Sequence, residues 1–169
     1  MSEEIRTDAA NWENQLAAAL PLFGHRNWIV VADAAYPAQS STGIETLTAD
    51  ADQLEVLRAV AEGIAASSHI RANVYLDSEL DFVSEQDAPG VEKYRRELQP
   101  ILAEAKISRI PHEQIIHKLD QAAQVFSILI LKSRLTIPYT SVFFELDCGY
   151  WSADAEARLR AAIGKAGTE

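Results

Sequence analysis

The sequence has little that would tie the chain to an oxidising compartment or a membrane. Its 169 residues include one cysteine, Cys148, so no disulfide can form within the chain, and a reducing compartment is expected. No stretch reaches about 18 uninterrupted apolar residues, which excludes a membrane-spanning helix. The first residues, Met-Ser-Glu-Glu-Ile-Arg, lack the apolar segment of a secretory signal. We therefore expect a cytoplasmic protein.

Positive charge is also in short supply. The chain has 25 acidic and 15 basic residues, and its formal net charge is −10 at pH 7. Such a surface repels the phosphates of nucleic acids and the headgroups of anionic lipids. We expect neither nucleic acid nor membrane as a partner, and a neutral ligand in a local pocket fits the composition better.

Several common catalytic signatures are absent. The sequence contains no glycine-rich nucleotide-binding loop and no Gly-x-Ser-x-Gly nucleophile motif. Asp33 follows an apolar run, as a phosphoryl-accepting aspartate would, but Ala35 stands where a second aspartate is needed to hold Mg²⁺. His112 and His117 are five residues apart, about 140° around a helix, so they do not share a zinc-binding face. No metal is expected.

Helix-like and strand-like segments alternate along the chain, which predicts one α/β domain, 1–169, with a mostly parallel sheet flanked by helices. Strands are expected over 28–32, 44–47, 70–76, 107–110, 125–131 and 141–146. Helices are expected from Thr7 or Asp8 to Phe23, from Asp50 or Asp52 to Ile64, over 91–106 with a kink or a division at Pro100, over 112–122 and over 153–166. Residues 77–90 are expected to form an acidic surface loop. Trp151 is expected either to pack or to lie at a subunit contact.

Three motifs occur in an informative order. Gly24-His25 is followed by the apolar strand 28–32 and then by Asp33-Ala34-Ala35-Tyr36-Pro37. Far downstream come Ile110-Pro111-His112-Glu113-Gln114 and, after another apolar run, Pro138-Tyr139. In order and spacing these motifs resemble the ribose pyranase and fucose mutarotase family, over about residues 15–150. The helix expected over 153–166 lies beyond that resemblance.

The resemblance implies an α/β enzyme that interconverts cyclic forms of a free monosaccharide, either anomers or pyranose and furanose, by acid–base ring opening. It implies that His25 is the proton donor, and that Asp33, His112 and the Tyr139-Thr140-Ser141 triplet contact the sugar. It further implies an isomerase without metal or organic cofactor. The family assembles into ring-shaped homo-oligomers, commonly decamers, with sites at subunit boundaries.

The triplet departs from the family pattern because Ser141 stands where the family has asparagine, and Arg134-Leu135 replaces a common Gly-Glu pair. A serine hydroxyl can donate and accept a hydrogen bond but is shorter than an amide. These departures leave open a catalytically inactive member that binds sugar or has a structural role. Taken alone, His25 can also be interpreted as a strand-end residue and Asp33 as a turn former.

The proposed chemistry suits a histidine, because an imidazole with a pKa near ~6.5 can give or take a proton near neutrality. Eight residue steps separate His25 from Asp33, or ~26 Å if they are fully extended. If both belong to one active site, the simplest arrangement takes them from different subunits.

Overall fold

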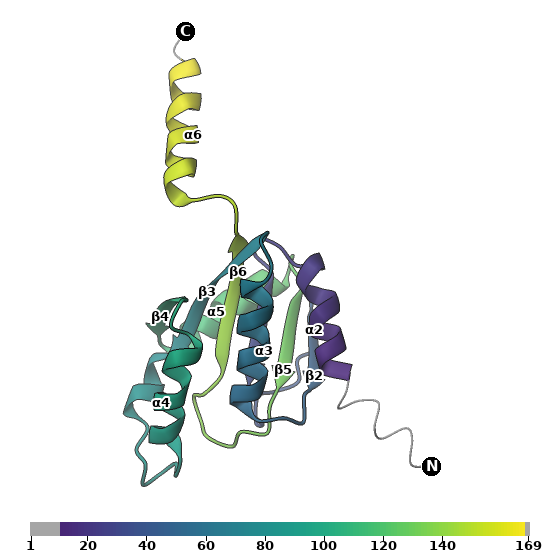
Figure 1. Ribbon diagram of the computed structural model, residues 1–169, viewed down its shortest axis with the longest axis vertical. Coiled ribbons are helices and arrows are strands. Elements are labelled where there is room, and N and C mark those ends of the chain that lie inside the picture. The colour runs from purple at the N-terminus through teal and green to yellow at the C-terminus, as the bar shows by residue number, and fades with distance from the viewer. Residues whose placement is uncertain (1–10, 168–169) are drawn as a thin grey trace.

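The computed structural model describes residues 11–167, which form a six-stranded sheet with helices on both faces (Figure 1). The strands are β1 (Trp28–Ala32), β2 (Ile44–Thr48), β3 (Ile70–Asp77), β4 (Lys106–Ile110), β5 (Ile128–Lys132) and β6 (Val142–Cys148). The helices are α2 (Asn11–Leu22), α3 (Gln53–Ala65), α4 (Val91–Ile101), α5 (His112–Ala123) and α6 (Ala153–Ala166), with a short 3-10 helix, η1 (Ser78–Phe82).

The strands lie in the order β2-β5-β1-β6-β3-β4. Neighbouring strands pair in parallel except around β6, which is antiparallel to both β1 and β3. Five strands therefore run in one direction, and the mostly parallel α/β fold expected from the sequence is confirmed. The carboxyl ends of these five strands meet at the edge of the sheet where β6 begins.

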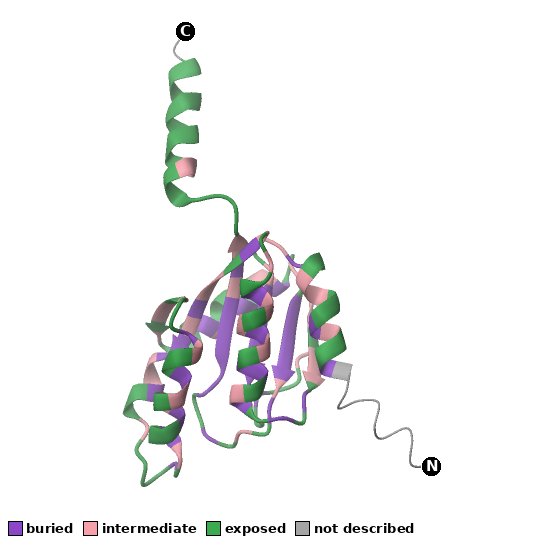
Figure 2. Ribbon diagram, in the orientation of Figure 1, coloured by how far each residue is buried: buried purple, intermediate pink, exposed green. Residues whose placement is uncertain are grey.

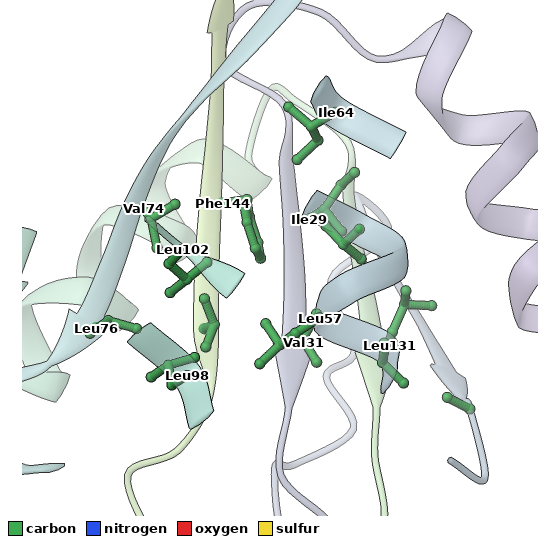
Figure 3. Packing of buried hydrophobic residues seen from close by; sticks show 14 of the residues in the cluster. Ile29, Val31, Leu57, Ile64, Val74, Leu76, Leu98, Leu102, Leu131 and Phe144 are labelled. Atoms are coloured by element: carbon green, nitrogen blue, oxygen red, sulfur yellow. The ribbon is translucent and has the colours of Figure 1, made fainter. Parts of the chain in front are cut away.

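The alternation of β1 side chains divides the core into two layers. All five residues of β1 are buried. Ile29 and Val31 point into the larger cluster, which α2, α3 and α4 cover, and Figure 3 shows both of them with Leu57 of α3. Trp28 and Val30 point to the other face, where they pack against α5. A strand covered on both faces explains the continuous apolar run in the sequence.

Three expected boundaries are wrong. The helix expected over 91–106 ends at Ile101, directly after Pro100, where a kink or a division was expected, and residues 102–106 do not continue it. The strand expected from Val125 begins at Ile128, because the amides of Val125 and Phe126 bond to the carbonyl of Ala122 and close α5 instead. The expected loop 77–90 contains η1, and its first residue is the buried end of β3. The expected capping residues Thr7 and Asp8 lie outside the described residues.

Helix α6 stands apart from the rest of the chain (Figure 1). It covers the residues expected from the sequence, and none of its side chains is buried, as Figure 2 shows by its exposed colouring. Trp151, just before it, is exposed, so it does not pack in the core. Within residues 11–167, no helix combines the length and apolar character required to cross a bilayer.

Candidate functional site

A pocket of about 380 Å³ opens at the edge of the sheet where parallel strands end. Asp33 follows β1, Asp77 ends β3, His112 follows β4 at the start of α5, and Tyr139 precedes β6. The remaining lining residues are Ala35, Tyr36, Pro37, Gln39, Glu113, Ile116 and Pro138. In open α/β sheets, ligands bind outside the carboxyl ends of the strands, so the topology itself marks this pocket.

A carboxylate–imidazole pair forms one wall of the pocket. The Nδ1 atom of His112 lies 2.9 Å from Oδ1 of Asp77. Asp77 is only 2% exposed, and its other carboxylate oxygen makes no hydrogen bond to any part of the chain that the structure describes. With Nδ1–H donated to Asp77, the Nε2 atom of His112 carries the lone pair and is free for a ligand.

Both members of this pair have shifted pKa values. The hydrogen bond to Asp77 raises the pKa of His112, which partial burial would otherwise lower, and the negative charge of Asp77 adds to the increase. Burial raises the pKa of Asp77, because desolvation disfavours the carboxylate more than His112 stabilises it. A pair with these two shifts holds a proton more firmly than either group does in water, which is a common property of proton-transfer sites.

Glu79 in η1 fixes the start of α5. Its two carboxylate oxygens accept the backbone N–H of His112, at 3.0 and 3.1 Å. A carboxylate at this position satisfies an unpaired amide of the first helical turn and complements the helix dipole. Glu79 thereby holds the backbone of His112 while Asp77 holds its ring.

Asp33 is positioned by Ser141. The hydroxyl of Ser141 donates to Oδ1 of Asp33 at 2.8 Å and accepts the backbone N–H of Asp33 at 3.2 Å. The other oxygen of Asp33 accepts the amide of Ala35 at 3.3 Å. Ser141 is buried, whereas Asp33 is partly exposed and lines the pocket. The serine hydroxyl therefore ties the end of β1 to the start of β6.

Tyr139 and Thr140 point in opposite directions. Tyr139 has a positive φ of 60°, is 41% exposed and lines the pocket, with its ring edge-on to His112 at a centroid distance of 5.9 Å. Thr140 is fully buried, and its hydroxyl donates to the carbonyl of Ile137 at 2.7 Å. Its own carbonyl accepts the hydroxyl of Tyr94 and the amide of Gln53, at 2.7 and 2.8 Å. This geometry does not support the sugar contact expected for the Thr140 side chain.

His25 lies at the other end of β1 from the pocket. Its side chain is 57% exposed, and Nδ1 is 2.9 Å from Oδ1 of Asp147 at the end of β6. The five residues of β1 separate it from Asp33, roughly 16 Å at ~3.3 Å per residue. The structure thus brings Asp33, His112 and Tyr139 together within one chain and keeps His25 away from them.

Asp147 holds His25 as Asp77 holds His112. Partial burial tends to raise the pKa of Asp147, but the hydrogen bonds from Arg71 and from the amide of Cys148 outweigh it and lower the pKa. Asp147 is therefore ionised at neutral pH and orients the exposed imidazole of His25 through Nδ1.

The sequence reasoning missed both carboxylates. Asp77 was assigned to a surface loop, although it ends an apolar strand in the same way as Asp33, which is the signal that could have revealed it. Asp147 became visible only from the register of β6, which places its carboxyl end beside the residues preceding β1. Within residues 11–167, no group of three or more histidine, cysteine, aspartate or glutamate side chains is arranged to hold a metal ion.

Fold and site together define an α/β domain with a ligand-sized pocket at the carboxyl ends of its strands. The sequence matches the model of the RbsD / FucU transport protein family over residues 10–144, and the chain belongs to this family. The resemblance to ribose pyranases and fucose mutarotases is thereby confirmed. Comparison with proteins of curated function found no match.

Solved structures share the fold at low identity. Bacillus subtilis RbsD complexed with D-ribose is 19% identical, with a TM-score of 0.56 over 82% of this chain and 93% of that chain. The fucose mutarotase from Streptococcus pneumoniae in complex with L-fucose is 18% identical, with a TM-score of 0.51 over 79% and 91%. FucU from Bifidobacterium longum is 17% identical, with a TM-score of 0.52 over 79% and 92%.

Proposed function

We propose that this protein is a cytoplasmic, cofactor-independent sugar mutarotase or pyranase that interconverts cyclic forms of a free monosaccharide. The observation that carries the proposal is the Asp77–His112 pair, which faces a pocket of monosaccharide size beside Asp33 and Tyr139. Two structures with the same fold are described as complexes with D-ribose and L-fucose, which supports the choice of ligand class.

Ring opening requires one base and one acid. A base removes the proton from the anomeric hydroxyl while an acid protonates the ring oxygen, so the bond between the anomeric carbon and the ring oxygen breaks and a carbonyl forms. The reverse transfers close the ring on either face or through another hydroxyl. We assign the base to Nε2 of His112, whose basicity the hydrogen bond to Asp77 increases. No redox step or covalent intermediate is needed.

The acid in this proposal is His25 of a second copy of the chain. Within one subunit, His25 and the pocket lie at opposite ends of β1, so an oligomer is needed to bring them together. His25 is exposed and oriented by Asp147, so its Nε2 can extend into a pocket on a neighbouring chain. A ring-shaped homo-oligomer with sites at its subunit boundaries is the assembly that we propose.

The remaining predicted site residues divide into two roles. Asp33 and Tyr139 line the pocket and are proposed to hold sugar hydroxyls and a face of the sugar ring. Ser141 and Thr140 are buried, and we propose that they position these two residues: Ser141 through its hydrogen bond to Asp33, and Thr140 by anchoring the start of β6.

Exchange NMR of the anomeric resonances of D-ribose and L-fucose tests this function. We expect the wild-type protein to accelerate exchange, and His25→Gln and His112→Gln each to reduce the acceleration about 100-fold or more. His117→Gln is the matched control, because His117 is exposed on the same helix as His112. Equal exchange rates with and without wild-type protein, together with sugar binding, would instead identify a sugar-binding member without catalysis.

A complementation experiment tests the shared site. We expect chains with His25→Gln and chains with His112→Gln each to lose most of the activity, whereas co-expressed chains form some interfaces that contain both intact histidines. We expect part of the wild-type exchange rate to return in this mixture. A mixture as inactive as its components would show that the two histidines do not act across a subunit boundary.

A further inference from the structure

A second apolar surface lies far from the sugar pocket, in a groove of about 710 Å³ between the end of α3, the end of α4 and the start of β3. Its floor is formed by the buried side chains of Ile64, Leu102 and Phe144. Small residues line its walls, among them Ala65 and Ala105. A groove with an apolar floor and alanine walls has the shape that admits one face of a helix.

Helix α6 carries a face of matching character. Leu159 and Ile163 are 44% and 58% exposed, and they are four residues apart, so they lie on the same side of the helix. Alanine residues extend this apolar stripe over its full length: Ala155, Ala162 and Ala166. An amphipathic helix with no buried residue is unusual in a folded chain, because its apolar stripe normally faces a core.

Charge supports the same pairing. Glu62 and Glu104 are exposed at the groove, on α3 and after α4, beside the exposed Lys106. Arg71 also lines the groove, but its charge is paired with Asp147. Arg158 and Lys165 are seven residues apart, which places them on one flank of the α6 stripe, where they outnumber the one acidic residue, Asp154. A helix lying in the groove with this flank toward the acidic residues brings opposite charges together at the edge of the contact, where they favour one orientation.

The position of α6 indicates which helix occupies the groove. Ala153, the first residue of α6, itself lines the groove, and the helix then leads away from the body of the chain (Figure 1). The side chains of Ser152 and Glu156 bond to the amide of Ala155 and to Nε1 of Trp151, at 3.0 and 2.7 Å, so the helix start is well defined. A two-fold axis near Ala153 would lay each α6 over the groove of the other chain.

We propose that α6 docks into the groove between α3 and α4 of a second copy of this chain, in a reciprocal exchange of helices. The 14 residues of α6 span about 21 Å, close to the length of the 13-residue α3 that forms one wall of the groove. Exposed aromatic residues at the root of the helix, Tyr150 and Trp151, lie where the two copies meet, and aromatic side chains are enriched at such contacts. Helix α6 lies beyond the family match, which ends at residue 144, so this contact belongs to this chain's own extension.

Disulfide trapping tests the proposal directly. In a Cys148→Ser background, chains with only Ala65→Cys are co-expressed with differently tagged chains that carry only Ile163→Cys. We expect a disulfide between the two chains under mild oxidation. Ala161→Cys replaces Ile163→Cys in the control, because position 161 lies about 160° around α6 from Leu159, on the face away from the stripe.

Absence of a cross-linked pair, or an equal yield with the Ala161→Cys control, would overturn the proposal. A disulfide that forms only within single chains carrying both Ala65→Cys and Ile163→Cys would also overturn it, because α6 would then fold back on its own groove. Sedimentation velocity gives a second measurement: Ile163→Asp should raise the dissociation constant of self-association at least about tenfold relative to Ala161→Asp. Equal self-association of these two variants would contradict the docking.

Discussion

Asp77→Asn is the substitution that tests the site most directly. It keeps the shape of the side chain at the end of β3 and replaces the carboxylate on Nδ1 of His112 by a neutral amide. The hydrogen bond to Asp77 is the main reason why the pKa of His112 is raised, so the substitution should lower that pKa toward its ordinary value. His112 then becomes a weaker base, and an amide that turns its N–H₂ group toward the ring favours the wrong tautomer.

We expect the exchange rate to fall about 100-fold, which is the lower part of the range for a positioned proton transfer. The loss is not larger because His112 is retained, although as a weaker base with a less favourable tautomer. The limb of the pH–rate profile that reports deprotonation of His112 should move to lower pH. Asp87→Asn, an aspartate exposed on a surface loop, is the control for the same chemical change outside the pocket.

Stability should respond to pH in the same experiment. A raised pKa for His112 contributes stability that is fully present below its unfolded pKa and is lost as pH rises through the folded value. A raised pKa for Asp77 acts in the same direction, because the buried carboxylate becomes costly as pH rises above its unfolded pKa. Carboxylates with lowered pKa values, such as Asp147, act in the opposite direction, so the pair is isolated by comparison with the variant. The difference in the urea-derived free energy of unfolding between wild type and Asp77→Asn should shrink as pH rises from acid toward neutral.

The result that would refute this reasoning is a variant Asp77→Asn with the exchange rate and pH profile of wild type. Such a result would remove the Asp77–His112 pair from the chemistry and leave it a structural role. A variant that lost activity but kept both pH profiles would show that Asp77 acts through packing alone.

Three further substitutions test the supports of the site. Ser141→Ala frees Asp33 from its hydrogen bond, and we expect KM for the sugar to rise about tenfold with a smaller change in kcat, measured by exchange NMR at several sugar concentrations. Gln53→Leu removes a buried amide that donates to the carbonyls of Val31 and Thr140 and accepts from the hydroxyl of Ser133, and urea unfolding should show a loss of about 3 kcal/mol in the free energy of unfolding. Glu79→Gln weakens the start of α5, and the same assay should show the free energy of unfolding lowered by about 0.5–1 kcal/mol.

The sequence was sufficient to predict the α/β architecture, because buried strands appear in it as continuous apolar runs. Trp28–Ala32 was predicted at its observed bounds, since all five side chains are covered. Boundaries failed where a backbone contact overrode the pattern: Val125 is apolar, yet it is 77% exposed and its amide bonds to the carbonyl of Ala122. Hydrophobicity alone does not distinguish a strand residue from a helix-terminating one.

The site was less accessible to the sequence because its residues come from separate strand ends. Asp33 and His112 were identified through the family resemblance. Asp77 has no motif around it, and the apolar strand that precedes it in the sequence carries no functional signal. Its importance comes from burial and from its contact with His112, 35 positions away. Such a contact is set by the parallel pairing of β3 with β4, which local sequence does not reveal.

A contact between an aspartate and a histidine occurs twice, at opposite ends of the paired strands β3 and β6. Asp77 orients His112 at the end where β6 begins, and Asp147 orients His25 at the end where β6 finishes. Each carboxylate contacts Nδ1 and leaves Nε2 for a ligand, but the length of the strands keeps the two histidines from one substrate within a subunit. If both act on one sugar, the acid and the base must come from different chains, and dissociating the assembly should then abolish exchange even though each subunit stays folded.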